Sequence, residues 1–223
     1  MEENISYKLV RSRRRSICII ISENGEVIVR APLKTSLSLI EDFLKLKADW
    51  VKKHITKINK VAIIPHEFTE GEEFLFMGDK VKLTFSGTNS KLIQLTEEAI
   101  LFPQKHSKNV KKLLEKWYRK AALNVMTERT IYYSEKSGLK FNEIKVKNTK
   151  RQWGSCTSKG NLSYNWHLIM APLQIIDYII VHELSHMAER NHSPKFWKVV
   201  ESILPDYKIR RKWLKSNKNL LIF

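Results

Sequence analysis

The chain is organised around one stretch, Val181-His182-Glu183-Leu184-Ser185-His186, which is followed closely by Asn191-His192-Ser193-Pro194. His182 and His186 are four residues apart, and Glu183 directly follows the first of them. This H-E-x-x-H spacing is typical of zinc hydrolases, because residues four apart lie about one turn apart on the same helix face. Two imidazoles on one face can hold a tetrahedral ion from one side, and Glu183 can lie beside a water bound to that ion.

Apolar residues around the motif predict a buried helix. Pro172 suits a first helical turn, and we expect the helix to run from Leu173 to about Glu189. Its apolar residues surround the helix axis almost completely, which is the pattern of a buried helix. They are Ile175, Ile176, Tyr178, Ile179, Ile180, Val181, Leu184 and Met187. The histidines and the glutamate on such a helix need polar partners, and a metal ion would supply them.

The residues after the motif predict a third histidine ligand. On a straight helix, His192 would point away from the face that His182 and His186 share. Ser193-Pro194 is the N-cap and first-turn pair of a new helix, so the motif helix must end before it. Asn191 tolerates the left-handed conformation that a sharp exit often uses, and His192 can then fold back toward the ion.

A catalytic zinc ion needs three protein ligands and an open position for water, and His182, His186 and His192 provide the three. Glu201, on the next helix, and Glu189 are the alternative third ligands. We prefer His192 because imidazole suits zinc and because the turn residues direct it there. The full spacing equals that of the metzincins, but Glu189 stands where they carry glycine, and no methionine follows His192 to form their Met-turn. The chain is therefore not expected to be a metzincin.

These residues predict a hydrolytic mechanism. Glu183 would take a proton from the zinc-bound water and later give it to the leaving amine, while zinc would polarise the scissile carbonyl. His167 and Tyr207 are candidates for a second donor to the oxyanion, although we prefer a structural role for both. The strand at Asn165-Trp166-His167 can offer backbone groups to an extended peptide, or Trp166 is simply part of the core.

Composition narrows the class of protein. The chain has 223 residues, enough to bury the core of one large domain or two small ones. Lys and Arg number 40 against 23 Asp and Glu, and the resulting charge of +17 attracts anionic partners or only aids solubility. The two distant cysteines, Cys18 and Cys156, do not form a disulfide framework. No signal peptide and no membrane-spanning apolar run are visible, so we expect a cytoplasmic protein.

The order of the predicted elements indicates an α+β fold in two parts. Residues 1–103 are expected to form a β-rich N-terminal subdomain with one helix, and residues 104–223 a domain that contains the buried motif helix. The boundary is placed near Pro103, because Ser107 can cap a long amphipathic helix that ends by Gly138. Strands at 143–148 and 161–167 then flank a loop of small and polar residues at 151–160.

With these residues in view, the chain resembles the YgjP-like metallopeptidase family, a zincin group similar to the SprT and Spartan proteases. The resemblance covers nearly the full length and implies a compact zincin-like domain behind a β-rich part, with zinc on His182, His186 and His192 and with Glu183 as the general base. Besides the H-E-x-x-H stretch, the matching motifs are Arg11-Ser12-Arg13-Arg14-Arg15, Trp117-Tyr118, Trp153-Gly154-Ser155-Cys156, Asn165-Trp166, Met170-Ala171-Pro172, Asn191-His192-Ser193, Phe196-Trp197 and Pro205-Asp206-Tyr207.

Three positions depart from the family pattern. Gln152 stands where an arginine commonly precedes the Trp-Gly-Ser-Cys motif, His167 replaces a frequent arginine, and Ser185 occupies a site often held by cysteine. None of these departures removes a zinc ligand.

The leading hypothesis is a zinc-dependent metallopeptidase that hydrolyses protein or peptide substrates. The first alternative is a DNA-associated basic protein, in which zinc is structural or the protease acts on DNA-bound proteins, and non-specific nucleic acid binds the basic surface. The Arg11–Arg15 run is then a phosphate-contacting patch, or otherwise a solvated hairpin loop. The second alternative is a zinc hydrolase of a non-peptide amide. No membrane partner is expected, and the sequence carries no signal for the oligomeric state.

Overall fold

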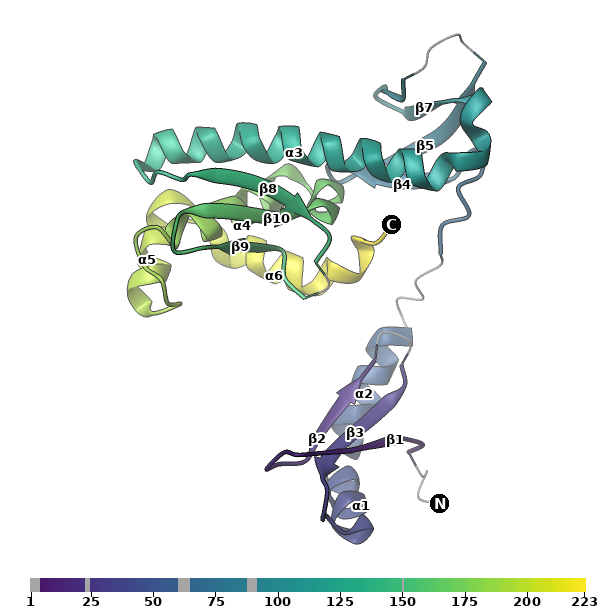
Figure 1. The fold of residues 1–223 in the computed structure, drawn as a ribbon, viewed down its shortest axis with the longest axis vertical. Coiled ribbons are helices and arrows are strands. Elements are labelled where there is room, and N and C mark those ends of the chain that lie inside the picture. Colours follow the sequence, from purple (N-terminus) through teal and green to yellow (C-terminus); the bar gives the residue numbers. More distant parts are fainter. Residues whose placement is uncertain (1–4, 23–24, 60–64, 88–91, 150) are drawn as a thin grey trace. The chain divides into compact units, whose positions relative to one another are not determined.

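The computed structural model describes residues 5–22, 25–59, 65–87, 92–149 and 151–223. The chain forms two compact units, Met1–Ile64 and Pro65–Phe223, and each has its own hydrophobic core (Figure 1). The described residues contain six α-helices and three small mixed sheets, so the predicted α+β class is confirmed. None of the described helices combines the length and the apolar character that a membrane crossing requires.

The first unit is a three-stranded sheet with two helices. Its strands are β1 (Lys8–Ser12), β2 (Cys18–Ile21) and β3 (Val27–Pro32), in the order β1-β3-β2. The predicted single helix is in fact two, α1 (Leu37–Leu46) and α2 (Ala48–Asn59), because the backbone leaves helical geometry at Lys47. Alternate residues of β3 and one face of each helix form the core, which comprises Val27, Val29, Ala31, Ile40, Leu44 and Val51.

The basic loop between β1 and β2 is not a hairpin loop. Strand β1 pairs with β3 in parallel and β2 pairs with β3 antiparallel, so the loop connects the two outer strands of the sheet. The Arg11 guanidinium donates hydrogen bonds to three carbonyl oxygens at and after the end of β3, those of Pro32, Leu33 and Thr35. At least one charge of the Arg11–Arg15 run therefore holds the chain together locally.

The second unit begins with a four-stranded sheet. Its strands are β4 (Glu73–Phe76), β5 (Asp79–Ser86), β6 (Gln94–Leu95) and β7 (Ala99–Pro103), in the order β4-β5-β7-β6. The turn between β4 and β5 is attached to residues far along the chain. The Met77 N–H donates to the Ile169 carbonyl at 2.7 Å, and the Gly78 N–H donates to the Met170 carbonyl at 3.1 Å.

Because of this attachment, the boundary between the two compact units lies earlier in the chain than the predicted domain boundary. The sequence placed it near Pro103, whereas the compact units divide between residues 64 and 65. Pro103 lies inside the second unit, at the end of β7. The physical reason is that the sheet made by β4 to β7 shares one core with the helices that follow, and the Tyr118 hydroxyl of α3 donates to the Leu75 carbonyl of β4 at 2.9 Å.

A long helix, α3 (Val110–Ser137), packs along the rest of this unit. A 3₁₀ segment, η1 (Gln104–Asn109), precedes it, so the helix begins three residues after the predicted cap at Ser107. Gly138 ends the helix as predicted, with a left-handed φ of 73° that favours glycine. The buried Asp177 carboxylate joins α3 to the motif helix, because it accepts hydrogen bonds from Arg129 and Tyr133.

A three-stranded sheet follows α3. Strands β8 (Glu143–Lys147), β9 (Gly154–Cys156) and β10 (Asn161–Asn165) lie in the order β8-β10-β9, with β10 parallel to β8 and antiparallel to β9. Strand β10 is central and paired on both sides, so of the two alternatives for this stretch the structure supports the one in which Trp166 is part of the core, and not the one in which the strand at Asn165 pairs with a peptide. Strand β9 is an outer strand of this sheet, and it lies in the stretch that was predicted to be a loop, because Gly-Ser-Cys lacks the apolar alternation of a typical strand.

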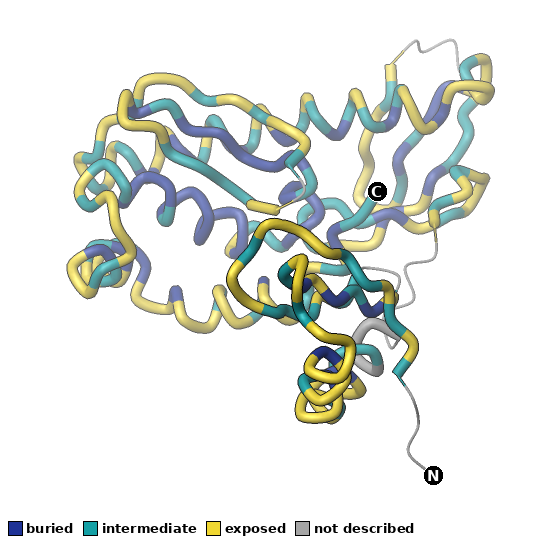
Figure 2. Tube along the Cα trace, turned by 60° about the horizontal axis from the view of Figure 1, so that its bottom comes forward, coloured by how far each residue is buried: buried dark blue, intermediate teal, exposed yellow. Residues whose placement is uncertain are grey.

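The motif helix occupies the centre of the second unit. After the 3₁₀ segment η2 (Trp166–Met170), the helix α4 (Leu173–Ser185) is buried on nearly every side (Figure 2). Two amphipathic helices, α5 (Pro194–Ile203) and α6 (Tyr207–Asn217), both pack against α4. The short η3 (Lys218–Leu220) follows α6. Helix α4 ends at Ser185, four residues before the predicted end near Glu189, and the chain turns there.

Candidate metal centre

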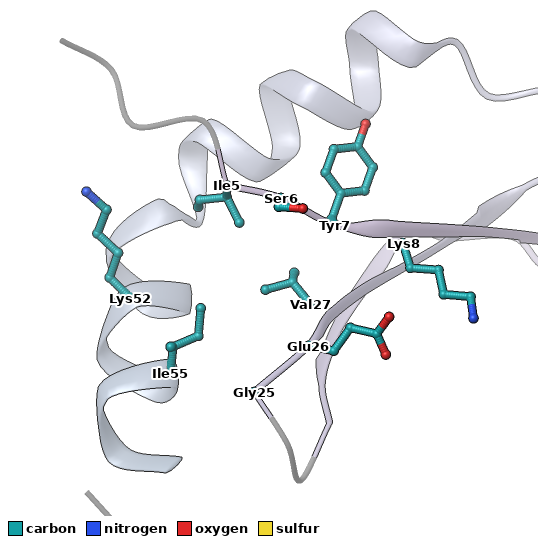
Figure 3. A pocket seen from close by; sticks show the side chains of 9 residues that line it. All are labelled: Ile5, Ser6, Tyr7, Lys8, Gly25, Glu26, Val27, Lys52 and Ile55. Carbon is teal, nitrogen blue, oxygen red and sulfur yellow. The ribbon is translucent and has the colours of Figure 1, made fainter. Parts of the chain in front are cut away.

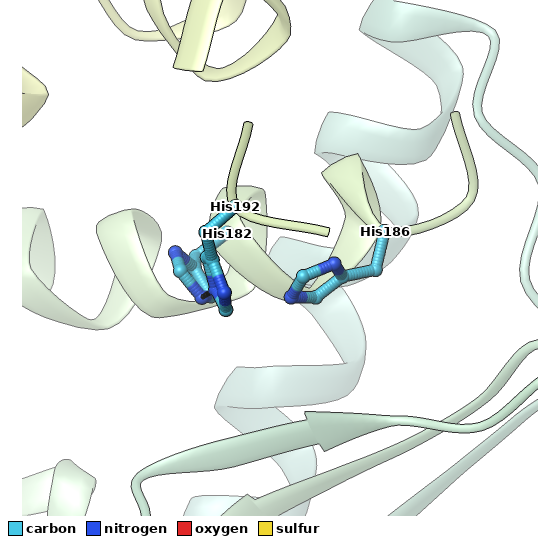
Figure 4. A group of neighbouring side chains, drawn as sticks. All are labelled: His182, His186 and His192. Atoms are coloured by element: carbon cyan, nitrogen blue, oxygen red, sulfur yellow. Dashed lines mark hydrogen bonds between the residues drawn. The ribbon is translucent and has the colours of Figure 1, made fainter. Parts of the chain in front are cut away.

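Three histidines converge at the end of α4. His182 lies in the last turn of the helix, His186 is its C-cap residue, and His192 returns from the connection to α5. The Nε2 atoms of His182 and His192 are 2.9 Å apart, and the potential ligand atoms of all three residues lie within 4.8 Å of one another (Figure 4). Two nitrogens bound to one tetrahedral zinc ion stand about 3.4 Å apart, so the cluster is close to a ligating arrangement.

The connection between α4 and α5 explains how His192 returns. Two successive turns follow Ser185, whose carbonyl accepts hydrogen bonds from the N–H groups of Ala188 and Glu189. Ser193 then caps α5, since its hydroxyl accepts a hydrogen bond from the Phe196 N–H, and Pro194 occupies the first turn as predicted. Asn191 does not adopt the left-handed conformation that the sequence suggested; its carbonyl instead accepts a tight hydrogen bond from the Ser193 N–H at 2.7 Å.

An aromatic side chain supports the three imidazoles. The ring of Phe196, which is fully buried, lies with its centroid 4.9 Å from that of His182, 4.5 Å from that of His186 and 4.8 Å from that of His192. Because Phe196 is in the first turn of α5, the same short connection that brings back His192 also supplies this support.

The imidazoles of His182 and His186 are in the neutral form that binds a metal ion. Burial, together with the nearby His186 and His192, lowers the pKa of His182 to about 3, and burial also lowers the pKa of His186. Neutral imidazole is the ligating form of histidine. The Nδ1 atom of His186 lies 3.1 Å from the Glu189 carbonyl, to which it can donate a hydrogen bond, so its Nε2 lone pair is free to face the cluster.

The pair formed by His182 and His192 is incomplete without a cation. Two neutral imidazoles that face each other through nitrogen share at most one proton, so one hydrogen bond is all they can form. In the part of the chain that the structure describes, the buried Nδ1 atom of His182 has no hydrogen-bond partner. An ion held by both lone pairs would fit this arrangement better than a single shared proton does.

Glu183 lies buried beside strand β9. Its side chain is only 5% exposed, and burial raises the pKa of its carboxyl group to about 8. A Cβ atom at Gly154 would lie 2.5 Å from the Glu183 Oε1 atom and 2.6 Å from its Cγ atom. Atoms that are not bonded to each other do not approach this closely, so a side chain at this position would clash with Glu183. Glycine is therefore required at this point of β9 for the carboxylate to reach its position, a role that the sequence analysis missed.

The alternative ligands and donors lie elsewhere. Among the described residues, the three histidines are the one group of potential metal ligands, and neither Glu189 nor Glu201 belongs to it. Glu201 contacts Lys208 instead. His167 stacks on Trp166 with ring centroids 4.0 Å apart, and Tyr207 stacks on Trp197 at 5.3 Å. Their environments agree with the structural roles that the sequence favoured.

A pocket of about 320 Å³ opens beside His182 and Glu183. Its described lining includes Trp153 and Gly154 from the β9 region, Tyr178 and Ile179 from α4, and cationic residues from the α6 region. Tyr178 was not singled out from the sequence, although it stands four residues before His182 and therefore shares its helix face. Its ring centroid is 6.0 Å from that of His182.

A larger hollow, about 840 Å³, lies in the first unit between the sheet and α2 (Figure 3). Its lining includes the apolar side chains of Ile5, Val27 and Ile55, and the other lining residues are polar, charged or glycine. The described residues that line it contain no group of potential metal ligands. Among the described residues, the one group of potential metal ligands therefore lies in the second unit.

Arg190 attaches the end of the motif to the sheet. Its guanidinium donates hydrogen bonds to the Thr157 carbonyl at 2.8 Å and to the Ser158 carbonyl at 2.9 Å, in the turn that follows β9. This arginine therefore ties the connection that carries His192 to the strand that borders Glu183. No spacing rule in the sequence points to it.

Comparison with known families assigns residues 15–217 to the family described as YgjP-like, metallopeptidase domain. No curated protein matches the chain. A solved structure, the metallopeptidase zymogen of Pyrococcus abyssi abylysin, is similar over 42% of this chain and 95% of its own, with 17% sequence identity and a TM-score of 0.38.

Proposed function

Because this chain belongs to the YgjP-like metallopeptidase family, we propose that it hydrolyses peptide bonds with a zinc ion held by His182, His186 and His192 and with Glu183 as the general base. Family membership identifies a metal-dependent peptidase. The observation that carries the finer assignment is the convergence of three imidazoles, those of His182, His186 and His192, next to the buried carboxyl group of Glu183.

The donor set supports zinc in particular. In many catalytic zinc sites the protein supplies three ligands, for example three imidazoles, and leaves the fourth coordination position to water or substrate. When bound, the ion supplies a Lewis acid that makes water a better nucleophile at neutral pH and polarises the scissile carbonyl. The hydrogen bond available from His186 to the Glu189 carbonyl would orient its imidazole for this purpose.

Glu183 moves the proton in this proposal. It follows His182 directly and is packed against Gly154, so its carboxylate faces the pocket from a fixed position. A buried carboxylate with a raised pKa has a high affinity for a proton, which is what the removal of a proton from the attacking water requires. The same group then returns the proton to the amine that leaves.

Two further features favour a peptide as the substrate. Strand β9 is an outer strand that pairs with β10 on one side, and it borders Glu183, so an extended peptide can add to its other side. Tyr178 lines the pocket, and burial raises the pKa of its phenol to about 12. It therefore stays protonated at neutral pH and can donate a hydrogen bond to the substrate oxygen that becomes negatively charged.

The test compares the native chain with Glu183→Gln and His192→Ala. Zinc would be measured by mass spectrometry after purification from zinc-supplied cells, and cleavage would be followed with fluorescently labelled casein. We expect one zinc ion per chain in the native protein and in Glu183→Gln, with cleavage by the latter reduced about 10³-fold through loss of the base. His192→Ala should lose both zinc and activity.

Glu201→Gln is the matched control, because it also removes one carboxylate near the motif but lies outside the histidine cluster. It should keep its zinc and its rate. A native protein that binds no zinc, or a Glu183→Gln variant that cleaves casein at the native rate, would refute the proposed mechanism.

A further inference from the structure

Three cations form a row beside the pocket. Arg211, Lys215 and Lys218 are spaced by four and three residues along α6 and into η3, so they share one face. All three line the pocket that contains His182 and Glu183. Leu214, which is buried, lies on the same side and lines the pocket with them.

Other cations of α6 are already engaged. Lys208 contacts the Glu201 carboxylate at 3.4 Å, and Arg210 donates a hydrogen bond to Asp206 at 2.9 Å. Within the described ranges, no carboxylate forms an ion pair with Arg211, Lys215 or Lys218. Among the described residues, no paired carboxylate therefore neutralises their positive charge.

The row is also partly held in place. The Arg211 guanidinium lies 4.6 Å from the centre of the Trp197 ring, and this ring stacks in turn on the buried Tyr207. A cation over an aromatic face is fixed in orientation without losing its charge.

The only carboxylate among the described residues of the pocket lining is that of Glu183. It is buried and packed against Gly154, so it does not neutralise the exposed cations at the rim. A ligand that enters the pocket therefore meets three positive charges close to the place where the bond is cleaved. Such a field attracts anionic groups and disfavours cationic ones.

We propose that Arg211, Lys215 and Lys218 form a substrate subsite that selects peptides with an acidic side chain, Asp or Glu, next to the bond that is cleaved. The proposal rests on the peptidase function proposed above and names its substrate class. A carboxylate side chain is the anionic group that a peptide supplies most commonly, and a peptide extended along β9 would pass Trp153 and Gly154 in the same pocket.

The experiment uses the full-length zinc-loaded protein and quenched fluorescent peptides. A peptide library first locates the bond that is cleaved, and matched peptides then carry Glu, Gln or Lys at each flanking position. We expect kcat/KM for the Glu peptide to exceed that for the Gln peptide roughly tenfold at low salt, mainly through KM, with the Lys peptide worst. The preference should shrink at about 0.5 M NaCl, where screening is strong.

Charge reversal separates this role from a structural one. The double variant Lys215→Glu/Lys218→Glu should invert the order, so that the Lys peptide is cleaved faster than the Glu peptide. Both positions are exposed, and the zinc content of the purified variant verifies the fold. Lys212→Glu is the matched control, because Lys212 is exposed on α6 but does not line the pocket, and it should keep the native order.

The outcomes distinguish the two proposals. If the native protein cleaves no peptide at all, the proposed function fails. If it cleaves Glu and Gln peptides equally, only the acidic subsite is overturned. A preference that depends on a free peptide C-terminus and disappears in amidated peptides would overturn the side-chain assignment as well. The assignment would also fail if charge reversal left peptide preference unchanged and abolished salt-dependent binding to duplex DNA.

Discussion

Two polar clusters lie at α4, one buried and one that reaches the surface at His192, and they differ in how fully their hydrogen bonds are satisfied. Near its start, Asp177 accepts two hydrogen bonds from Arg129, at 2.7 and 2.8 Å, and one from Tyr133 at 3.1 Å. Near its end, His182 and His192 face each other through two nitrogens. The first cluster is closed and joins α4 to α3, whereas the second has lone pairs left over. Polar residues at one helix can thus have their hydrogen bonds satisfied within the fold or keep lone pairs unused, and this remaining bonding capacity distinguishes the two clusters.

The largest effect is expected from opening the closed cluster. Asp177→Ala leaves the Arg129 guanidinium without its carboxylate, and the loss of one partner of a buried pair costs about 3–5 kcal/mol. Partial exposure of Arg129 favours the lower end of this range. Urea unfolding measures the loss, and the zinc bound per folded chain should not change. Glu73→Ala, which breaks the exposed pair with Lys80, should cost far less, because solvent screens the exposed pair. Equal losses in the two variants would remove the distinction between buried and exposed pairs.

A change beside the open cluster, at the glycine that packs against Glu183, should affect activity more than stability. In Gly154→Ala the new methyl group would displace the Glu183 carboxylate, and a misplacement of about 1 Å lowers kcat on the order of 10²-fold. Casein cleavage and thermal unfolding would be measured together. Gly87→Ala is the control, because a Cβ there meets nothing within 4 Å. Full activity in Gly154→Ala would show that Glu183 has another position open to it.

Tyr133→Phe examines one bond of the closed cluster. It should lower stability by about 1.5 kcal/mol, because the hydrogen bond to a charged carboxylate is lost. Burial and the charge of Asp177 raise the pKa of Tyr133. The folded state therefore favours the protonated phenol, so this stabilisation is complete below pH 10 and declines as pH rises through the folded pKa. The stability gap between the native protein and the variant should narrow at alkaline pH, and a constant gap would contradict the assignment.

The smallest effect concerns the connection that returns His192. Ser193→Ala removes the cap of α5 and should cost about 1 kcal/mol. Because His192 precedes the cap directly, zinc affinity should fall a few fold, in proportion to this loss. Competition with a zinc-binding dye measures the affinity. Ser202→Ala, near the end of the same helix, should leave the affinity unchanged. An unaltered affinity in Ser193→Ala would mean that Phe196 alone holds the connection.

Local signals in the sequence were enough for the parts of the site that follow from spacing along one helix and its exit. The helical positions of His182, His186 and Glu183 depend on the helix period, and the return of His192 depends on the Ser193-Pro194 start signal. These signals act over a few residues, so they are readable without the tertiary structure.

The parts that were missed depend on contacts between distant segments. Gly154 matters because it meets Glu183, and Tyr178 matters because the pocket opens beside it. The compact units divide between residues 64 and 65, and not near Pro103, for the same reason, since the contacts of Met77 with Ile169 and of Tyr118 with Leu75 cannot be inferred from either partner alone. Strand β9 was overlooked because its pairing with β10, and not its composition, makes it a strand.

The contact between the β4–β5 turn and η2, the segment just before α4, can form only late in protein synthesis. Met77 and Ile169 are separated by roughly ninety residues, which a ribosome adds in about 5–18 s. During this interval the turn has emerged without the carbonyl groups that it will bind. The histidines are made later still, so the growing chain carries no assembled hydrolytic centre while most of it is being translated.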